Sequence, residues 1–217
     1  SHELRTPLAV IKGTMEVLIR KPRNQQEYEE KIQFCISEVD RLNHMVDQLL
    51  LLARFENQKQ NVKQETIYLN ALVLDNLTRF SEKSESKKLK IKTEFAEDYY
   101  LLSDNYLVSI IISNLISNAI KYSNPNGEIA IELGKTSDVV TFSITDYGVG
   151  IAKNDLDKIF NSFYRSDVSN HPEIKGTGLG LSIVKRLCDL LKLEIAVESD
   201  LNQGTKFVLS FPLAKLK

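Results

Sequence analysis

The stretch Val139-Val-Thr-Phe-Ser-Ile-Thr-Asp146-Tyr-Gly148-Val-Gly150-Ile151 decides the fold of most of this chain. Up to Asp146 its residues alternate as in a strand, so one face carries an apolar row that Asp146 closes. A carboxylate on a core-facing side is costly unless it has a partner. Asp146 therefore either caps the following turn or accepts a hydrogen bond from a ligand, which Gly148 and Gly150 would let the backbone approach closely.

A second glycine group, Gly176-Thr177-Gly178-Leu179-Gly180-Leu181, leads into a segment that predicts a helix over 179–191. Backbone amides of a glycine-rich loop at a helix start form an anion site, and phosphate is the usual guest. The spacing is G-x-G-x-G and no buried strand precedes it, which argues against a Rossmann site. The sequence holds no G-x-x-x-x-G-K-[ST], so it is not a P-loop either.

A polar stripe runs along the helix predicted over 104–122. Asn114, Asn118 and Lys121 follow the i, i+4, i+7 rule and share one side, while apolar residues cover the other. Two amide oxygens one turn apart suit Mg²⁺ carried by phosphates, and the lysine suits the phosphates themselves. A merely polar helix face is the alternative, but it does not account for the two glycine loops in the same region.

The region after residue 66 mixes helices with paired strands and has no regular βαβ alternation. This order predicts an α+β sandwich, with one mixed sheet covered by helices on one face. The other expected elements are a helix over 70–86, strands over 90–95, 100–103 and 128–134, a short helix over 154–159, and a closing hairpin of 193–199 with 205–212.

The first 58 residues read as two helices joined by a short turn. Apolar residues recur in heptads, which specify a left-handed helical bundle. One hairpin has only its own two seams to bury, so we expect a homodimeric four-helix bundle; the alternative is a hairpin packed against the second domain. The seam residues are Leu4, Leu8, Ile11, Met15 and Leu18, then Tyr28, Ile32, Cys35, Val39, Leu42, Val46, Leu49 and Ala53. We expect domains at 1–58 and 67–217, joined by a linker at 59–66.

The start of the first helix concentrates chemistry. His2, Glu3 and Thr6 place an imidazole, a carboxylate and a hydroxyl within one and a half turns. A histidine at such a place is by itself usually a surface residue. Thr6 has a structural alternative too, because it precedes Pro7, a position that favours extended backbone.

Composition excludes several classes of protein. The formal net charge is −1, and the densest basic run, Lys87 to Lys92, is interrupted by apolar residues and flanked by glutamates, so we interpret it as a solvated face. Nucleic acid is therefore not an expected partner. No apolar run approaches a membrane span, so we expect a cytoplasmic fragment without membrane contact. Cys35 and Cys188 suit reduced core thiols better than a disulfide.

The motifs together resemble the catalytic core of sensor histidine kinases, in the expected order and over essentially the whole chain. The string from His2 to Leu8 resembles the H-box. Asn114 to Tyr122 resembles the N-box, Asp146 to Ile151 the first glycine box, Phe160 to Arg165 the F-box, and Gly176 to Leu181 the second glycine box.

This resemblance implies a Bergerat-type fold that binds ATP with Mg²⁺. It implies that Asp146 reads the adenine amino group and that Asn118 with Asn114 holds Mg²⁺. It also implies that Lys121, Tyr122 and Arg165 contact ribose or phosphates, with 166–177 as the ATP lid. The remaining expected nucleotide contacts are Gly148, Gly150, Ile151, Phe163, Tyr164, Gly176, Thr177, Gly178, Leu179, Gly180 and Leu181.

The resemblance further implies autophosphorylation of His2, transfer to an aspartate of a response regulator receiver domain, and phosphatase activity through Thr6. The alternative is a non-catalytic dimeric module that binds ATP and docks a response regulator. In the family the first helix runs several turns before the histidine, whereas this chain starts one residue ahead of His2. We therefore expect a fragment without its sensor, whose full-length protein is anchored in the cell membrane.

Overall fold

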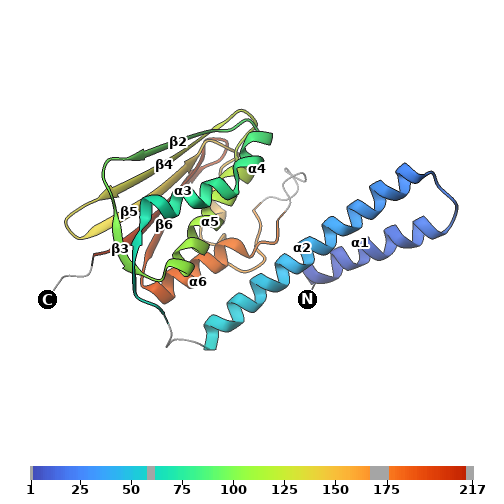
Figure 1. The fold of residues 1–217 in the computed structure, drawn as a ribbon, viewed down its shortest axis with the longest axis horizontal. Helices are drawn as coiled ribbons and strands as arrows, with labels where there is room; N and C mark the ends of the chain where they lie inside the picture. The colour runs from blue at the N-terminus through green and yellow to red at the C-terminus, as the bar shows by residue number, and fades with distance from the viewer. Residues whose placement is uncertain (1, 58–61, 167–175, 214–217) are drawn as a thin grey trace. The chain divides into compact units, whose positions relative to one another are not determined.

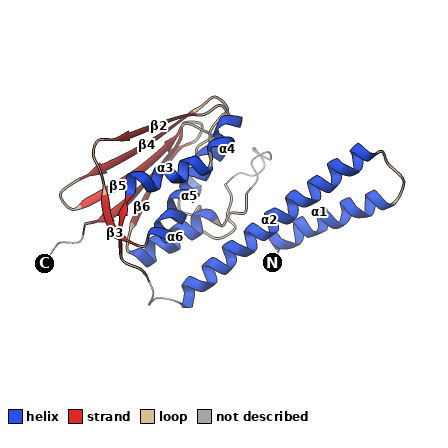
Figure 2. Ribbon diagram, viewed as in Figure 1, coloured by secondary structure: helices blue, strands red, loops and turns tan. Residues whose placement is uncertain are grey.

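A computed structural model describes residues 2–57, 62–166 and 176–213, and the chain divides into two units between Asn57 and Gln58. The first unit is a helical hairpin and the second an α/β domain (Figures 1 and 2). The prediction of a helical hairpin followed by an α+β sandwich is therefore confirmed.

The hairpin consists of α1 (His2–Ile19) and α2 (Gln25–Asn57). Between them, Asn24 accepts a hydrogen bond from the backbone N–H of Glu27 at 2.8 Å, which caps the start of α2. Pro7 lies inside α1 and is buried. The short turn predicted between the two helices spans residues 20–24.

Each predicted heptad seam divides between two faces of its helix. In α1, Leu18 is buried while Leu8 and Met15 are more than half exposed. In α2, Cys35 is buried, whereas every second seam position is exposed: Ile32, Val39, Val46 and Ala53. One set of seam positions thus faces inward within the hairpin, and the other lies open. His44 does not belong to the seam and is exposed.

The α/β domain contains a five-stranded mixed sheet of order β2-β4-β5-β7-β6. Only β2 and β4 pair in parallel, and the other neighbours are antiparallel. Helices α3, α5 and α6 lie on one face of this sheet (Figure 2). The strands are β2 (Lys90–Phe95), β4 (Glu128–Lys135), β5 (Val139–Asp146), β6 (Glu194–Asp200) and β7 (Gly204–Pro212).

The expectation of a single sheet was wrong. β1 (Glu65–Tyr68) pairs antiparallel with β3 (Tyr100–Ser103) in a separate two-stranded sheet. β1 takes Glu65 and Thr66 from the expected linker, because these polar residues gain ladder hydrogen bonds from a strand far along the chain. Tyr68 and Tyr100 stack across the pair, with ring centroids 5.1 Å apart.

Two expected helices also differ. The segment 70–86 forms α3 (Leu69–Arg79) and α4 (Ser81–Ser86), divided at Phe80, whose N–H bonds the carbonyl of Leu77 three residues back. The segment 154–159 is no α-helix: a 3₁₀ turn, η1 (Lys153–Asp155), is followed by further turns.

Helix α5 (Asn105–Tyr122) is the centre of the domain core. Asp104 caps its start by accepting from the backbone N–H of Leu107 at 3.1 Å. One side of α5 is fully buried against α3, α6 (Gly180–Leu191) and β5. The buried residues are Leu107, Val108, Ile111, Ile112, Leu115, Ile116, Ala119 and Ile120. The polar stripe on its other side is therefore held in a fixed place.

Candidate functional site

Asp146 ends β5 on the buried face that the alternation predicted, and its side chain is only 4% exposed. Its carboxylate accepts backbone hydrogen bonds from Gly148, at 3.0 Å to Oδ1, and from Thr205. Burial raises the pKa of Asp146 to about 6, and these two hydrogen bonds oppose that rise. The Gly148 bond is the turn cap of the structural alternative, yet the group stays a costly buried charge that a donor-bearing ligand would satisfy.

The first glycine loop is threaded against the C-terminal end of α5. A Cβ at Gly148 would collide with the carbonyl oxygen of Tyr122, so only glycine fits there. The backbone N–H of Val149 donates to the same carbonyl oxygen at 3.2 Å. The loop that follows Asp146 is thus in direct contact with the end of α5.

The polar stripe of α5 faces the second glycine loop. The amide nitrogen of Asn114 donates to the carbonyl of Ile110 at 2.9 Å, which leaves Oδ1 as an acceptor directed at Gly180. The amino group of Lys121 lies against Gly176 and 3.2 Å from the hydroxyl of Tyr122. Asn118, between Asn114 and Lys121 on the stripe, is half-buried.

The second glycine loop ends at Gly180, where α6 begins. Gly178 has a φ of +72° and packs on the backbone of Phe163, whose N–H donates to the Gly178 carbonyl at 2.8 Å. Thr177 Oγ1 accepts from the N–H of Leu179, which is fully buried, at 3.3 Å. Phe163 and Gly178, which flank the predicted lid of residues 166–177, are therefore held together by a backbone hydrogen bond, and residues 167–175 between them lie outside the described part of the chain.

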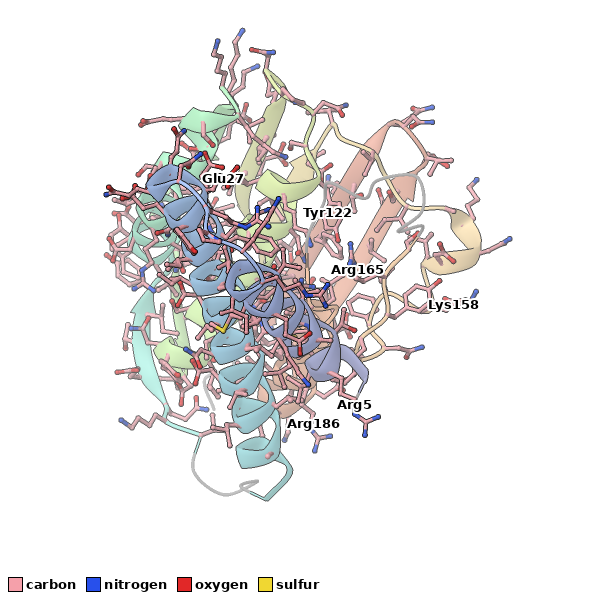
Figure 3. The ribbon with its side chains drawn as sticks, turned by 90° about the vertical axis from the view of Figure 1, so that its right-hand side faces the viewer. Arg5, Glu27, Tyr122, Lys158, Arg165 and Arg186 are labelled. Carbon is pink, nitrogen blue, oxygen red and sulfur yellow. The ribbon has the colours of Figure 1, made fainter. Side chains whose placement is uncertain are left out.

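Two side chains of the F-box have different neighbours: Tyr164 contacts Asp155, and Arg165 lies near Tyr122. The hydroxyl of Tyr164 donates to Asp155 Oδ1 at 2.7 Å, and Ser166 also donates to Asp155. These hydrogen bonds, that of Ser166 foremost, lower the pKa of Asp155. Arg165 lies near Tyr122 (Figure 3), and its charge opposes the rise in the Tyr122 pKa that burial causes.

Two residues around Asp146 and Ile151 were missed from the sequence. Ser199 Oγ accepts from the N–H of Ile151 at 2.8 Å and lies 3.0 Å from Thr205 Oγ1. Thr205 pairs directly with Asp146 in the β5–β7 register. The closing hairpin was predicted, but only the register shows that its second strand starts beside Asp146.

The expected phosphoacceptor site lies at the start of the other unit. Helix α1 begins at His2, and the side chains of His2 and Glu3 lie outside the described residues. Thr6 is exposed on the first turns of this helix.

The predicted metal ligands, Asn114 and Asn118, are amide side chains. No group of three or more histidine, cysteine or acidic side chains that could hold a metal ion occurs among the described residues. The Asn114 amide nitrogen makes the hydrogen bond to Ile110, so the amide oxygen Oδ1 is the atom that fits a cation carrying phosphate ligands.

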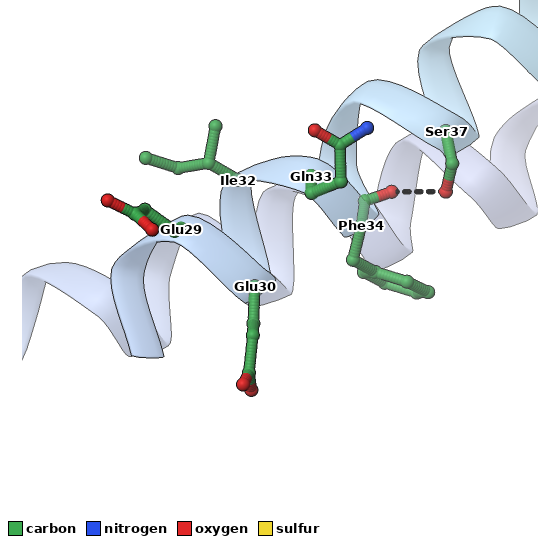
Figure 4. A pocket seen from close by; sticks show the side chains of 6 residues that line it. All are labelled: Glu29, Glu30, Ile32, Gln33, Phe34 and Ser37. Carbon is green, nitrogen blue, oxygen red and sulfur yellow. Dashed lines mark hydrogen bonds between the residues drawn. The ribbon is translucent and has the colours of Figure 1, made fainter. Parts of the chain in front are cut away.

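A hollow on α2 is formed by that helix alone (Figure 4). Ser37 Oγ donates to the carbonyl of Phe34 at 2.7 Å inside it, and Ile32 and Phe34 expose apolar surface there. None of its lining residues belongs to the predicted site.

Within the described ranges, the helices are all too short or too polar to cross a membrane.

Two family models match the chain. The histidine kinase-, DNA gyrase B- and HSP90-like ATPase model matches residues 103–215. The His Kinase A (phospho-acceptor) domain model matches residues 1–58. The two matches fall on the α/β domain and on the helical hairpin.

Curated relatives are longer than this chain. The sensor protein RprX of Bacteroides fragilis is 31% identical over 221 residues, which cover 99% of this chain and 42% of RprX. The sensor protein IrlS of Burkholderia pseudomallei is 32% identical over 212 residues, 98% of this chain and 45% of IrlS. The chain thus spans about half the length of the curated relatives it matches.

Solved structures share the fold. The Acinetobacter baumannii histidine kinase AdeS superposes with a TM-score of 0.80 at 26% identity, covering 99% of both chains. The histidine kinase ThkA, solved in complex with the response regulator protein TrrA, gives a TM-score of 0.80 at 23% identity, covering 97% of this chain and 59% of ThkA.

Proposed function

This chain belongs to the histidine kinase-, DNA gyrase B- and HSP90-like ATPases, and from that premise we propose that it is an ATP-dependent protein histidine kinase that phosphorylates His2 and passes the phosphoryl group to an aspartate of a response regulator. The observation that carries the proposal is the convergence of Asp146, two glycine loops and the polar stripe of α5 on one end of that helix. The resemblance to the catalytic core of sensor histidine kinases, inferred from the sequence motifs, is confirmed.

ATP binding is assigned to this convergence. Asp146 would accept a hydrogen bond from the adenine amino group, since its carboxylate is buried and has acceptor capacity left. Asn118 and Asn114 would hold Mg²⁺, which when bound neutralises phosphate charge. Lys121 would contact the phosphates, with Arg165 beside it at Tyr122.

Phosphoryl transfer is assigned to His2. A neutral imidazole nitrogen attacks the γ-phosphorus, the bond to the bridging oxygen breaks, and ADP leaves. The product imidazolium then loses the proton on its other nitrogen, and Glu3 is the acceptor that lies next in sequence. With an unperturbed pKa of about 6.5, imidazole is mostly neutral at pH 7 and is therefore nucleophilic.

The hairpin supports the dimer within this proposal. Exposed apolar residues of α2 follow heptad spacing in one stripe: Ile32, Ile36, Val39, Val46 and Leu50. We name these five residues the α2 stripe. A second copy of the hairpin would cover it, as a four-helix bundle requires. The response regulator partner is proposed from the family and from ThkA, which shares the fold and was solved in complex with the response regulator protein TrrA. Cytoplasmic location and membrane attachment through further segments belong to the proposal as well.

The test is incubation of the full chain with γ-labelled ATP. A label on His2 that is labile in acid and stable in alkali is expected for the kinase and absent for a module that only senses ATP. Asn118→Asp should abolish the label while leaving the fold intact, because its charge sits near the triphosphate. Undiminished labelling of a folded Asn118→Asp protein would contradict the site.

Asp146→Ala tests the adenine contact separately. Loss of a charged hydrogen bond should weaken ATP far more than GTP, which lacks the amino donor. Titration of both nucleotides measures this, and equal weakening would make Asp146 a purely structural residue.

Thr6 is proposed to hold a water for dephosphorylation of the regulator. It lies one turn after His2 on the same face of α1 and is exposed. Thr6→Ala should leave His2 labelling within about threefold, yet slow dephosphorylation of the regulator by about a hundredfold, because the attacking water loses the hydroxyl that orients it. Both rates are measured on one preparation; a parallel loss, or no loss of either, would contradict a separate role.

A further inference from the structure

Lys87, in the turn after α4, is no solvated member of a basic run. It is half-buried, and its ammonium group donates to three main-chain carbonyl oxygens at the end of α5. These are the oxygens of Ile120 at 3.0 Å, Lys121 at 2.7 Å and Ser123 at 3.1 Å. The three hydrogen bonds use every donor that an ammonium group has. Lys87 also lies outside residues 103–215, which the ATPase family model matches.

The end of α5 is fully satisfied only with Lys87 in place. The last four carbonyls of a helix have no partner within the helix. In α5 the first of them, that of Ala119, accepts from the N–H and the hydroxyl of Ser123 at 3.0 and 2.7 Å. The next two accept from Lys87, and the last, that of Tyr122, accepts from Val149 in the first glycine loop at 3.2 Å. Lys87 and the first glycine loop therefore supply the hydrogen-bond donors for the last three carbonyls of α5.

The position of Lys87 is fixed by its own backbone. Its carbonyl accepts from the N–H of Asn126, in the turn after α5, at 2.9 Å. The N–H of Leu89 donates to the carbonyl of Ser84 in α4 at 3.0 Å. A cation held at the negative end of the helix dipole stabilises that end. The side chain thus meets α5 from a preformed turn.

The turn that Lys87 holds carries the proposed nucleotide contacts. The Lys121 carbonyl accepts a hydrogen bond from Lys87, and the Lys121 amino group lies against Gly176. The Tyr122 carbonyl accepts a hydrogen bond from the N–H of Val149. We infer that Lys87 is a positioning residue for ATP: it sets where Lys121 and the first glycine loop stand toward the nucleotide. The inference rests on the proposed ATP site and is independent of phosphoryl transfer.

The experiment compares Lys87→Met with Lys88→Met in the full chain. Lys88 is the adjacent, exposed lysine with a φ of +54°, so its methionine variant removes the same charge and keeps the same backbone penalty. The Kd for MgATP should rise about tenfold in Lys87→Met, as for loss of charged hydrogen bonds, and stay within about twofold in Lys88→Met. Amide hydrogen exchange without nucleotide should quicken at Val149 and Ser123 in Lys87→Met and stay unchanged at Phe142 in the sheet.

Each outcome decides something. Wild-type chain that does not bind MgATP overturns the proposed function, while the exchange at Val149 still tests the geometry. Equal Kd values for the two methionine variants overturn the positioning role, and so does faster exchange throughout β5, which would show general destabilisation. Should Lys87→Met not fold, Lys87→Arg takes its place. Its planar fork cannot meet three converging carbonyls, so a rise in Kd of about threefold is expected, and wild-type affinity with wild-type Val149 exchange would overturn the inference.

Discussion

The helical hairpin and the α/β domain bury their apolar side chains to very different degrees. In the domain, Phe142 of β5 and Leu115 of α5 are completely buried in a core shared by helices and sheet. In the hairpin, the whole α2 stripe is between 44% and 52% exposed. A single chain therefore completes the core of the domain but leaves the α2 stripe exposed, and in the dimer that we propose a second copy covers this stripe.

The largest effect is expected at the α2 stripe. Val39→Glu with Val46→Glu should convert the proposed dimer to monomers, because two buried, unpaired carboxylates in each copy oppose association. Light scattering measures the mass. The control is Gln26→Glu with Gln33→Glu, exposed residues at the same seven-residue spacing on another face of α2, which should stay dimeric. An unchanged mass for the valine variant would contradict the bundle.

A core truncation in the domain should leave the hairpin untouched. Phe142→Ala removes a fully buried ring and should destabilise the α/β domain by about 3–5 kcal/mol. Calorimetry should show the domain transition lowered, with the mass of the dimer unchanged. Thr141→Ala, on the other face of the same strand, should cost less than about 1 kcal/mol. Loss of the dimer in folded Phe142→Ala protein would show that the two units are not independent.

The parts predicted from the sequence are those in which local pattern and packing agree. The alternation of β5 places Asp146 on the buried face, and the periodicity of α5 separates its core from its polar stripe. Each pattern belongs to a single element with one buried side, and the spacing of apolar residues along that element is enough to predict which side is buried.

The parts that escaped prediction depend on contacts between distant residues. The three acceptors of Lys87 lie 33 to 36 residues away in sequence, so its run of lysines looked solvated. Thr205 meets Asp146 only through the β5–β7 register. The heptads predicted the hairpin, but a repeat does not tell which seam positions face the same chain and which lie open to a second copy.

The buried charge at Asp146 should make the domain, and not the hairpin, sensitive to pH. Its folded pKa of about 6 exceeds the ordinary value of 3.8, so the folded state holds a proton between these values that the unfolded state has released. Stability therefore falls as pH rises through this window, by about 3 kcal/mol for two pKa units. Asp146→Asn should remove this loss.

Urea unfolding followed by circular dichroism at pH 4 and pH 7.5 measures the difference. The asparagine variant should match wild type at pH 4 and be about 3 kcal/mol more stable at pH 7.5. A stability gap that is equal at both pH values would mean that Asp146 does not titrate in this window.

The smallest effect concerns backbone strain, which again separates the two regions. All non-glycine residues with positive φ in the described chain lie in the α/β domain, and Lys192 is one of them, with φ 56° and ψ 40° at the C-terminal cap of α6. This left-handed conformation favours glycine, so Lys192→Gly should stabilise the domain by about 0.5–1 kcal/mol. Arg186→Gly, at an exposed position inside α6, should instead destabilise it by about 1 kcal/mol, because glycine weakens a helix interior. Thermal unfolding of both variants measures the opposite signs; a loss of stability in Lys192→Gly would show that the lysine side chain contributes more than its backbone conformation costs.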